Sequence, residues 1–235
     1  MAAPDTPRRR TRRPRAEREA EILEAARAVF AEQGYAAAAV AEIAARAGVV
    51  EGTVYAYFDS KRALLIAVMK GFYEELIRDT ERGLGAVRGV ENRLRFVIRQ
   101  HLDTFARELG LCRLIVSEAR PDVALYDEAI LELNRRYTGL ALAVLEEGVR
   151  DGTLRSDLVP SVTRDLLYGG IEHAVWRSVF TGAPLDAAGL ADQLSEALLG
   201  GILARPASEE PASESTVLRL ERAIERLESR IANGS

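Results

Sequence analysis

Hydroxyl and cationic side chains gather in the segment EGTVYAYFDSK, residues 51–61. Thr53, Tyr55 and Tyr57 carry hydroxyl groups, and Lys61 lies where a new helix is expected to begin. Such groups suit hydrogen bonds to phosphate oxygens and base edges. A cation in the first turn of a helix opposes the helix dipole, so a phosphate contact explains Lys61 better than helix stability does. The segment therefore predicts contacts with a nucleic acid.

A helix-turn-helix arrangement would position these side chains. One short helix is expected over residues 41–47, it stops at Gly48, and a second is expected at about 52–58. Val54 and Phe58 are four residues apart and are expected to pack inward, which turns the hydroxyl-rich face outward. The second helix of this layout can lie in the major groove of DNA.

Residues 17–65 resemble the N-terminal domain of the tetracycline-repressor (TetR/AcrR) family, through FAEQGY, EIAARAGV and GTVYAYFDSKRALL. The resemblance implies an all-α homodimer that pairs a three-helix DNA-binding domain with a ligand-binding domain of about six helices. Ligand binding would then change the separation of the two recognition helices. By matching position, the residues implied to contact DNA are Thr53, Tyr55, Tyr57 and Lys61, with Glu51, Gly52 and Ala56 facing the bases.

The chain departs from the family pattern before both short helices. Ala38-Ala39 and Val50 stand where the family often has Ser or Thr, so two helix caps, each worth about 1 kcal/mol, are missing or replaced. We therefore expect few direct contacts between side chains and base edges. Arg12 and Arg13 belong to an arginine-rich arm, residues 1–15, expected to be disordered when free and to reach a minor groove or the DNA backbone. The alternative is a solubilising tail.

The rest of the chain shows helical periodicity and no convincing strand alternation, so an all-α fold is predicted. The DNA-binding domain is placed at 16–65 and a ligand-binding and dimerisation domain at 66–204. Beyond the first helix, which should end at Gln33-Gly34, and the two short helices, the expected helical stretches are 61–83, 91–109, 111–119, 123–150, 160–181 and 187–204.

A catalytic or metal-binding protein is not favoured. His101, His173 and Cys112 lack the spacing of metal ligands, and Ser117-Glu118 lies far from His173 in sequence with no nucleophile motif. No window is long and apolar enough to cross a membrane, no secretory signal is seen, and a lone cysteine cannot form an internal disulfide. We therefore expect no enzyme activity, no cofactor and a cytoplasmic location.

Apolar helix faces in the larger domain predict a ligand cavity with a basic mouth. The stretch 112–176 resembles, in layout, TetR-type fatty-acid-metabolism regulators that bind acyl-CoA, through a segment L-x-x-x-E-x-R, the sequence VLEEGVRDGTL and the sequence LLYGGIEHAVW. Arg120 best matches their pocket-mouth arginine; the alternative is an arginine paired with Glu118 or solvated. The candidate ligand-binding residues are Leu94, Ile98, His101, Phe105, Arg113, Arg120 and Tyr137. The effector is expected to be acyl-CoA or another small hydrophobic molecule.

The last two large helices are expected to form a four-helix dimer interface, as the resemblance implies. After a polar linker at 205–215, a heptad pattern over 216–232 predicts a coiled-coil helix that joins subunits, or alternatively an amphipathic helix packed on its own domain. A dimer, and through this helix a higher oligomer, is expected. The candidate dimerisation residues are Leu166, Gly170, Trp176, Leu194, Leu198, Leu220, Ile224 and Leu227.

These observations together favour a dimeric, ligand-responsive transcriptional repressor that binds a pseudo-palindromic operator on double-stranded DNA. Fatty-acid metabolism genes are the expected targets if the effector is acyl-CoA, and efflux or catabolic genes otherwise. A different functional class is the alternative: a structural DNA-binding protein that assembles on DNA through its arginine arm and its C-terminal helix.

Overall fold

The computed structural model describes residues 14–122 and 128–204 of the 235-residue chain. Within these residues the fold is helical, and the β-type pairing found is an isolated bridge between Leu154 and Leu203. The predicted arm with Arg12 and Arg13, the linker, and the C-terminal helix with Leu220, Ile224 and Leu227 lie outside the described residues.

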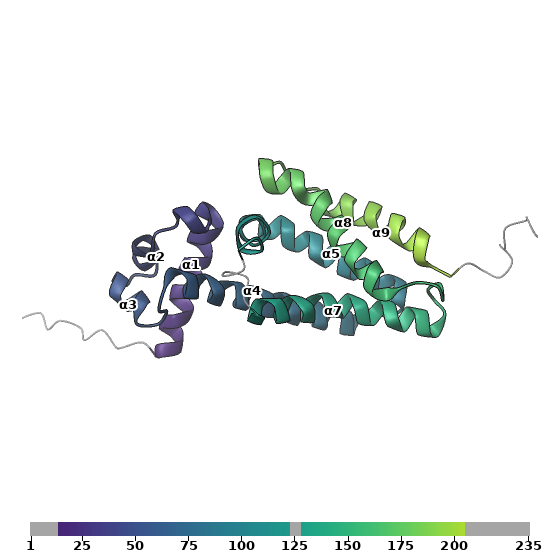
Figure 1. Ribbon diagram of the computed structural model, residues 1–235, viewed down its shortest axis with the longest axis horizontal. Helices are drawn as coiled ribbons and strands as arrows, with labels where there is room; N and C mark the ends of the chain where they lie inside the picture. The colour runs from purple at the N-terminus through teal and green to yellow at the C-terminus, as the bar shows by residue number, and fades with distance from the viewer. Residues whose placement is uncertain (1–13, 123–127, 205–235) are drawn as a thin grey trace, which may run out of the picture.

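Three helices form the N-terminal end of the molecule, at the left of Figure 1. They are α1 (Arg15–Ala37), α2 (Val40–Arg46) and α3 (Glu51–Tyr55). The helix α1 bends at Gly34, whose φ of 79° and ψ of 174° leave the helical region, so the predicted stop at Gln33-Gly34 is confirmed. The helix α3 is shorter than the predicted 52–58, because the backbone leaves the α-helical pattern after Tyr55 and Ala56 is its C-cap.

The helix α4 (Lys61–Ala86) runs from the N-terminal bundle into the larger part of the molecule without a break (Figure 1). Ser60 caps it, since its hydroxyl oxygen accepts a hydrogen bond of 3.1 Å from the Ala63 backbone N–H. The expected boundary between residues 65 and 66 therefore falls inside one continuous helix.

The larger part is built from the rest of α4 and the helices that pack on it. They are α5 (Val90–Arg107), α6 (Leu109–Leu114), η1 (Ile115–Ala119), α7 (Glu128–Asp151), α8 (Pro160–Thr181) and α9 (Ala187–Ile202). The helix α5 packs mainly on α9, and α7 packs on α4 and α8. The predicted helices at 160–181 and 187–204 agree with α8 and α9 within two residues, and the predicted helix at 111–119 is divided between α6 and η1.

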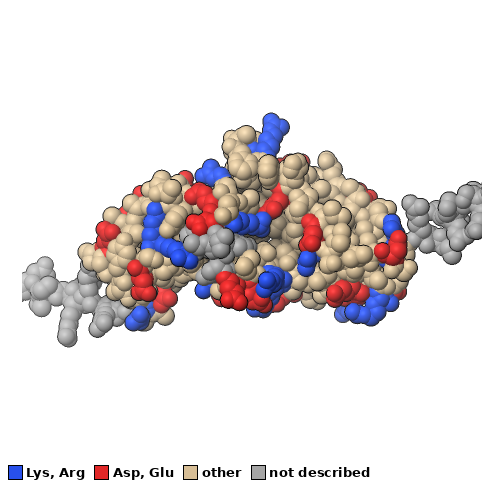
Figure 2. All heavy atoms as spheres, viewed as in Figure 1, with Lys and Arg blue, Asp and Glu red and all other residues tan. Residues whose placement is uncertain are grey.

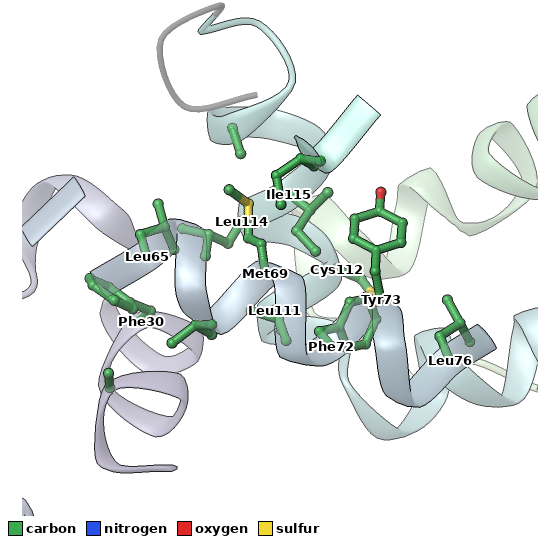
Figure 3. Close-up of a cluster of buried hydrophobic side chains, with 14 of the residues drawn as sticks. Phe30, Leu65, Met69, Phe72, Tyr73, Leu76, Leu111, Cys112, Leu114 and Ile115 are labelled. Atoms are coloured by element: carbon green, nitrogen blue, oxygen red, sulfur yellow. The ribbon is translucent and has the colours of Figure 1, made fainter. Parts of the chain in front are cut away.

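A continuous apolar core connects the N-terminal bundle with the larger part. Its side chains include Phe30 of α1, Leu65 and Met69 of α4, and Leu111 and Leu114 of α6, all at most 1% exposed. Figure 3 shows these side chains following α4 from the N-terminal bundle toward Tyr73. A second apolar cluster lies at the far end and contains Leu94 and Val144. The two parts of the chain are thus packed as one body at the α1–α4–α6 junction.

Helices α1 and α6 approach each other closely at Gly110. A Cβ atom at this position would lie 2.3 Å from the backbone oxygen of Ala31, which no side chain permits. This close contact holds α6 against α1 in the N-terminal bundle.

Candidate nucleic-acid interface and ligand cavity

The side chains of α3 divide into buried and outward-facing groups as the sequence predicts. Val54 is fully buried and Phe58 is 8% exposed, and both join the apolar core with Ile43. Tyr55 is 45% exposed, while Thr53 and Tyr57 are half-buried. Glu51, Gly52 and Ala56 are exposed. The face that these six residues share is available for a macromolecular partner, and their contact with DNA stays a prediction.

The two missing helix caps are confirmed. Ala39 and Val50 occupy the N-cap positions of α2 and α3, and neither forms a side-chain cap. Val50 is 73% exposed. The first-turn N–H groups of both short helices therefore have no side-chain cap, and those without a backbone partner can donate hydrogen bonds to phosphate oxygens.

Arg15, at the start of α1, contacts the segment 51–61 that contains α3. The guanidinium of Arg15 lies over the ring of Tyr57, 5.1 Å from its centroid. Figure 2 shows acidic and basic side chains mixed over the face in view, without a large patch of one sign. In the sequence, positive charge is concentrated in residues 1–18, which contain seven arginines and two acidic residues and so have a net charge of +5.

Lys61 has contacts within the protein that the sequence did not suggest. Its ammonium nitrogen donates a hydrogen bond of 3.2 Å to the Ala36 carbonyl oxygen and lies 4.7 Å from the centre of the Tyr35 ring. Burial lowers the pKa of Lys61, and the carboxylate of Glu118 acts in the opposite direction. Lys61 thus joins the start of α4 to the end of α1, and a phosphate contact would come in addition.

We expect the substitution Lys61→Ala to weaken binding to all DNA sequences similarly. The slope of log affinity against log salt concentration should fall by about one for each subunit, since one phosphate contact is lost. Lys70→Ala, nine residues further along α4, is the matched control and should leave the slope unchanged. An unchanged slope for Lys61→Ala would mean that this lysine only holds α1 and α4 together.

A cavity of about 340 Å³ lies in the larger part of the molecule. Its walls come from α4, α5, α6, η1, α7 and α8, and its size is at the lower end of the range of ligand cavities, about 300–1,000 Å³. Apolar and aromatic residues in the wall include Phe72, Leu76, Phe105 and Ile115. The arrangement can bind a small molecule that is partly apolar.

Four of the seven predicted ligand residues line this cavity: His101, Phe105, Arg120 and Tyr137. The other three do not. Leu94 and Ile98 are at most 1% exposed and belong to the apolar core, because they lie on parts of α5 that pack against other helices. Arg113 is exposed and lies outside the cavity wall. Helical spacing indicated a buried face but could not separate core from cavity.

Arginines mark the solvent side of the cavity. Arg120 forms an ion pair with Glu172 of α8, not with Glu118, which corrects that alternative. Arg135 lines the cavity as well, its side chain is 71% exposed, and its closest acidic partner is Glu132 at 3.6 Å. Arg164 also lines the wall. Asp165, which pairs with Arg164 at 2.7 Å, and Glu172 also line the cavity, so the three arginines exceed the two carboxylates by one positive charge. Arginines placed in this way suit phosphate or carboxylate groups.

An aromatic cluster closes the inner wall. The His101 Nδ1 atom lies 2.7 Å from the Tyr137 hydroxyl, and the His101 ring packs edge-on against Tyr168 and Phe105, at centroid distances of 5.0 and 5.3 Å. Burial, together with the charge of Arg120, lowers the pKa of His101 to about 3, so the imidazole is neutral. Burial raises the pKa of both tyrosine hydroxyls, which stay protonated.

The neutral state of His101 predicts a pH dependence of stability. Its folded pKa of about 3 is below the unfolded value of 6.5, so the unfolded chain binds the proton more readily. The contribution of His101 to the free energy of unfolding is therefore fully present above about pH 6.5 and is lost as the pH falls toward 3. Between pH 7 and pH 5 the free energy of unfolding should fall by about 2 kcal/mol more in the wild type than in His101→Asn. Denaturant titrations at both pH values measure the difference, and equal losses would contradict it.

Several wall residues were not predicted. Tyr73, Asn134, Thr138 and Tyr168 line the cavity, and Glu172 holds Arg120. Tyr168 and Glu172 belong to the sequence LLYGGIEHAVW, which carries part of the resemblance to acyl-CoA-binding regulators, but the residues predicted from this stretch were Leu166, Gly170 and Trp176, as dimerisation residues. Their spacing of four on one helix was the signal that α8 has a second, cavity-facing side.

The single π-helical turn η1 connects the cavity with the N-terminal bundle. The Arg120 N–H donates to the Ile115 carbonyl oxygen at 2.9 Å, the i to i+5 bond of a π turn. Two residues before Arg120, Glu118 of η1 accepts a hydrogen bond of 2.9 Å from the Tyr35 backbone N–H. One short segment therefore contacts the cavity rim and the end of α1. Such turns are frequent at functional sites.

The exposed face of α8 carries large apolar side chains. Val162, Leu166, Trp176 and Phe180 are 54%, 67%, 50% and 57% exposed. Trp176 is therefore not a core tryptophan; it stacks with His173 and Phe180, at centroid distances of 5.5 Å for each pair. Gly170 is exposed on the same helix, while Leu194 and Leu198 of α9 are half-buried against the core. Several large apolar side chains exposed along one helix are typical of a protein–protein interface.

No helix among the described residues is long and apolar enough to cross a membrane, and they hold no cluster of His, Cys, Asp and Glu that could bind a metal ion. Cys112 is buried, and burial raises the pKa of its thiol to about 12.

A helix-turn-helix bundle with an outward-facing recognition segment, fused to a helical part with an internal cavity, defines the class of one-component DNA-binding regulators. Residues 22–68 match the family described as bacterial regulatory proteins, tetR family, and residues 88–202 match the tetracyclin repressor-like, C-terminal domain. The chain belongs to the TetR family, whose members are transcriptional regulators that bind DNA and small-molecule effectors and act as dimers.

Similar proteins include regulators of lipid metabolism. The fatty acid metabolism regulator protein of Bacillus subtilis is 29% identical over 182 residues, which cover 77% of this chain and 94% of that protein. The transcriptional repressor KstR2 of Mycolicibacterium smegmatis is 29% identical over 205 residues, 85% of this chain and 95% of that one. The crystal structure of FadR from Bacillus subtilis in complex with stearoyl-CoA is 28% identical and covers 77% of this chain and 98% of its own, with a TM-score of 0.71.

Proposed function

We propose that this protein is a dimeric transcriptional repressor that leaves its operator when a long-chain acyl-CoA binds in the cavity of the larger part. The observation that carries the proposal is the cavity itself, with an apolar and aromatic interior and an arginine rim formed by Arg120 and Arg135. An acyl-CoA has matching chemistry: an apolar chain for the interior and phosphates for the rim. FadR of Bacillus subtilis, a similar protein, has been crystallised with stearoyl-CoA.

The geometry of η1 supports a route from ligand to DNA. A phosphate near Arg120 competes with Glu172 for the guanidinium, so ligand binding loosens the ion pair between η1 and α8. The same segment holds Glu118 against the Tyr35 N–H, and α6 is pressed against α1 at Gly110. A shift of η1 therefore changes the position of α1 and, through the shared core, the recognition helix.

The dimer of this proposal uses the apolar face of α8 together with α9. Two copies related by a two-fold axis would cover Leu166 and Trp176 and would present two copies of α3 to successive major-groove faces. The C-terminal heptads stay the proposed route to a higher oligomer and lie outside the described residues.

Fluorescence anisotropy tests the proposal with DNA from upstream of the protein's own gene, at fixed salt, with stearoyl-CoA or free CoA added. We expect tight binding that stearoyl-CoA releases and free CoA does not. If the protein binds the DNA tightly and stearoyl-CoA does not release it, the protein is still a DNA-binding regulator, but stearoyl-CoA is not its effector.

Neighbouring arginines provide a matched pair of variants. Arg135→Ala removes a charge from the cavity rim and should raise the stearoyl-CoA concentration needed for release about tenfold. Arg136→Ala removes a charge that pairs with Glu81 outside the cavity and should leave this concentration unchanged. Equal effects of the two variants would argue against phosphate binding at the rim.

A further inference from the structure

The inner wall of the cavity contains polar groups that a saturated acyl chain would leave unused. The His101 Nδ1 atom is engaged by the Tyr137 hydroxyl, and no described residue hydrogen-bonds to its other ring nitrogen, Nε2. Because His101 lines the cavity and its imidazole is neutral, Nε2 is available to an uncharged ligand atom.

The hydroxyl of Tyr168 is also without a partner. It is buried, and no described residue meets it with hydrogen-bonding geometry, although the Tyr137 hydroxyl is close enough to influence its pKa. Buried hydroxyls are nearly always hydrogen-bonded, and an unpaired one is costly. Since Tyr168 and His101 both line the cavity and pack edge-on against each other, a ligand oxygen in the cavity beside the two rings can reach both polar groups after a small side-chain shift.

The ring nitrogens of His101 decide which ligand atom fits. If the protonated Tyr137 hydroxyl donates to Nδ1, the proton of the neutral imidazole is on Nε2, which then donates to an acceptor oxygen. In the other tautomer Nε2 accepts, and a ligand hydroxyl suits it. In both cases the partner is an uncharged oxygen atom.

We propose that His101 Nε2 and the Tyr168 hydroxyl form a hydrogen-bonding subsite for a carbonyl or hydroxyl oxygen on the acyl part of a CoA thioester. The subsite selects an oxygenated acyl group over a saturated one of the same length. This inference rests on the proposed function, because it assumes that the acyl part enters the cavity. The charged side chains of Arg120 and Arg135 lie at the rim of the cavity. The subsite residues are uncharged and belong to the aromatic inner wall.

Calorimetric titration of the DNA-free protein tests the subsite with three probes of equal chain length: dodecanoyl-CoA, 3-oxododecanoyl-CoA and 12-hydroxydodecanoyl-CoA. We expect at least one oxygenated probe to bind the wild type about tenfold more tightly than dodecanoyl-CoA, since a site with unpaired buried polar groups penalises a ligand that leaves them so. Tighter binding of 3-oxododecanoyl-CoA would show that the His101 proton is on Nε2. Tighter binding of 12-hydroxydodecanoyl-CoA alone would show that the proton is on Nδ1.

Two variants locate the preference. Tyr168→Phe removes a hydroxyl that has no partner, so the fold should tolerate it, and the double variant His101→Phe/Tyr137→Phe removes both members of a hydrogen bond at once. Each should reduce the preference to about threefold or less while the Kd of dodecanoyl-CoA is kept. Tyr73→Phe is the control, because that cavity-lining hydroxyl already donates to the Asn134 Oδ1 atom at 3.4 Å.

The outcomes separate this inference from the proposed function. If the wild type binds all three probes with equal affinity, the proposed subsite is wrong, while the proposal that acyl-CoA is the effector still holds. A loss of affinity in Tyr168→Phe that is the same for all probes would assign the hydroxyl to the thioester carbonyl and would also overturn it. If none of the probes binds the wild type, the proposed acyl-CoA response fails, and the subsite with it.

Discussion

The substitution Leu166→Glu is expected to abolish dimer formation and to lower operator affinity roughly hundredfold or more. Leu166 is 67% exposed on α8, in the middle of an apolar face with Val162 and Trp176. A buried, unpaired carboxylate at a two-fold interface is strongly unfavourable, and the symmetry places the change in both subunits. A monomer keeps one recognition helix and loses the gain of about 10²- to 10⁴-fold that two linked contacts provide.

Analytical ultracentrifugation and anisotropy measure the two effects separately. Because residue 166 is exposed in the monomer, the melting temperature of the isolated fold should change little beyond the loss of dimer stabilisation. Leu131→Glu is the matched control, since Leu131 is also partly exposed, at 39%, but lies on α7 and does not belong to the apolar face of α8, so it should leave both properties intact. A Leu166→Glu protein that remains dimeric would place the interface on another face.

The helical architecture could be predicted from the sequence because its signals are local. The stripe of Ile22, Ala26, Val29 and Phe30 is fully buried, as its spacing indicates. Boundaries at Gly34 and Gly182 coincide with positive φ angles, which glycine adopts without strain. Such features depend on residues within one or two turns of each other, so the chain contains them without reference to its tertiary contacts.

The cavity could be predicted only in part because it depends on contacts between distant elements. Ile98 and His101 lie on the same helix and both face inward, yet Ile98 packs in the core and His101 lines the cavity. Tyr168 is separated from His101 by 67 positions, and only the packing of α5 against α8 brings them together. No periodicity in one helix carries this information.

The role of Glu118 also escaped prediction, because a π turn decides where its side chain points. A π turn adds a residue to the helical turn and so rotates the side chains that follow relative to an α-helix. Here it sends Glu118 toward α1 and Arg120 toward α8. Residues two apart also point to opposite sides of a regular helix, but the sequence does not show which of the two faces α1 and which faces α8. Gly34 is the residue that makes room for this contact.

The substitution Gly34→Ala is expected to destabilise the protein by about 3 kcal/mol. With φ of 79° and ψ of 174°, Gly34 occupies a region that is essentially restricted to glycine, which costs about 1–3 kcal/mol for other residues. A Cβ atom there would also lie 2.6 Å from the Glu118 Oε1 atom, so the carboxylate must move and release the Tyr35 N–H. Denaturant unfolding measures the loss. Gly48→Ala is the control: its φ of 66° is also positive, but a Cβ atom would meet nothing within 4 Å, so it should cost only about 1 kcal/mol.

A second variant separates backbone strain from the loss of the Glu118 contact. Glu118→Ala removes the hydrogen bond to the Tyr35 N–H but leaves the Gly34 backbone unstrained, so it should cost about 1–2 kcal/mol. Because η1 connects the cavity rim to α1 through this carboxylate, Glu118→Ala should also leave operator affinity nearly intact while stearoyl-CoA releases the DNA less completely. A Glu118→Ala protein with unchanged release would show that the signal passes through the α1–α6 contact at Gly110 instead, and that Glu118 serves only stability.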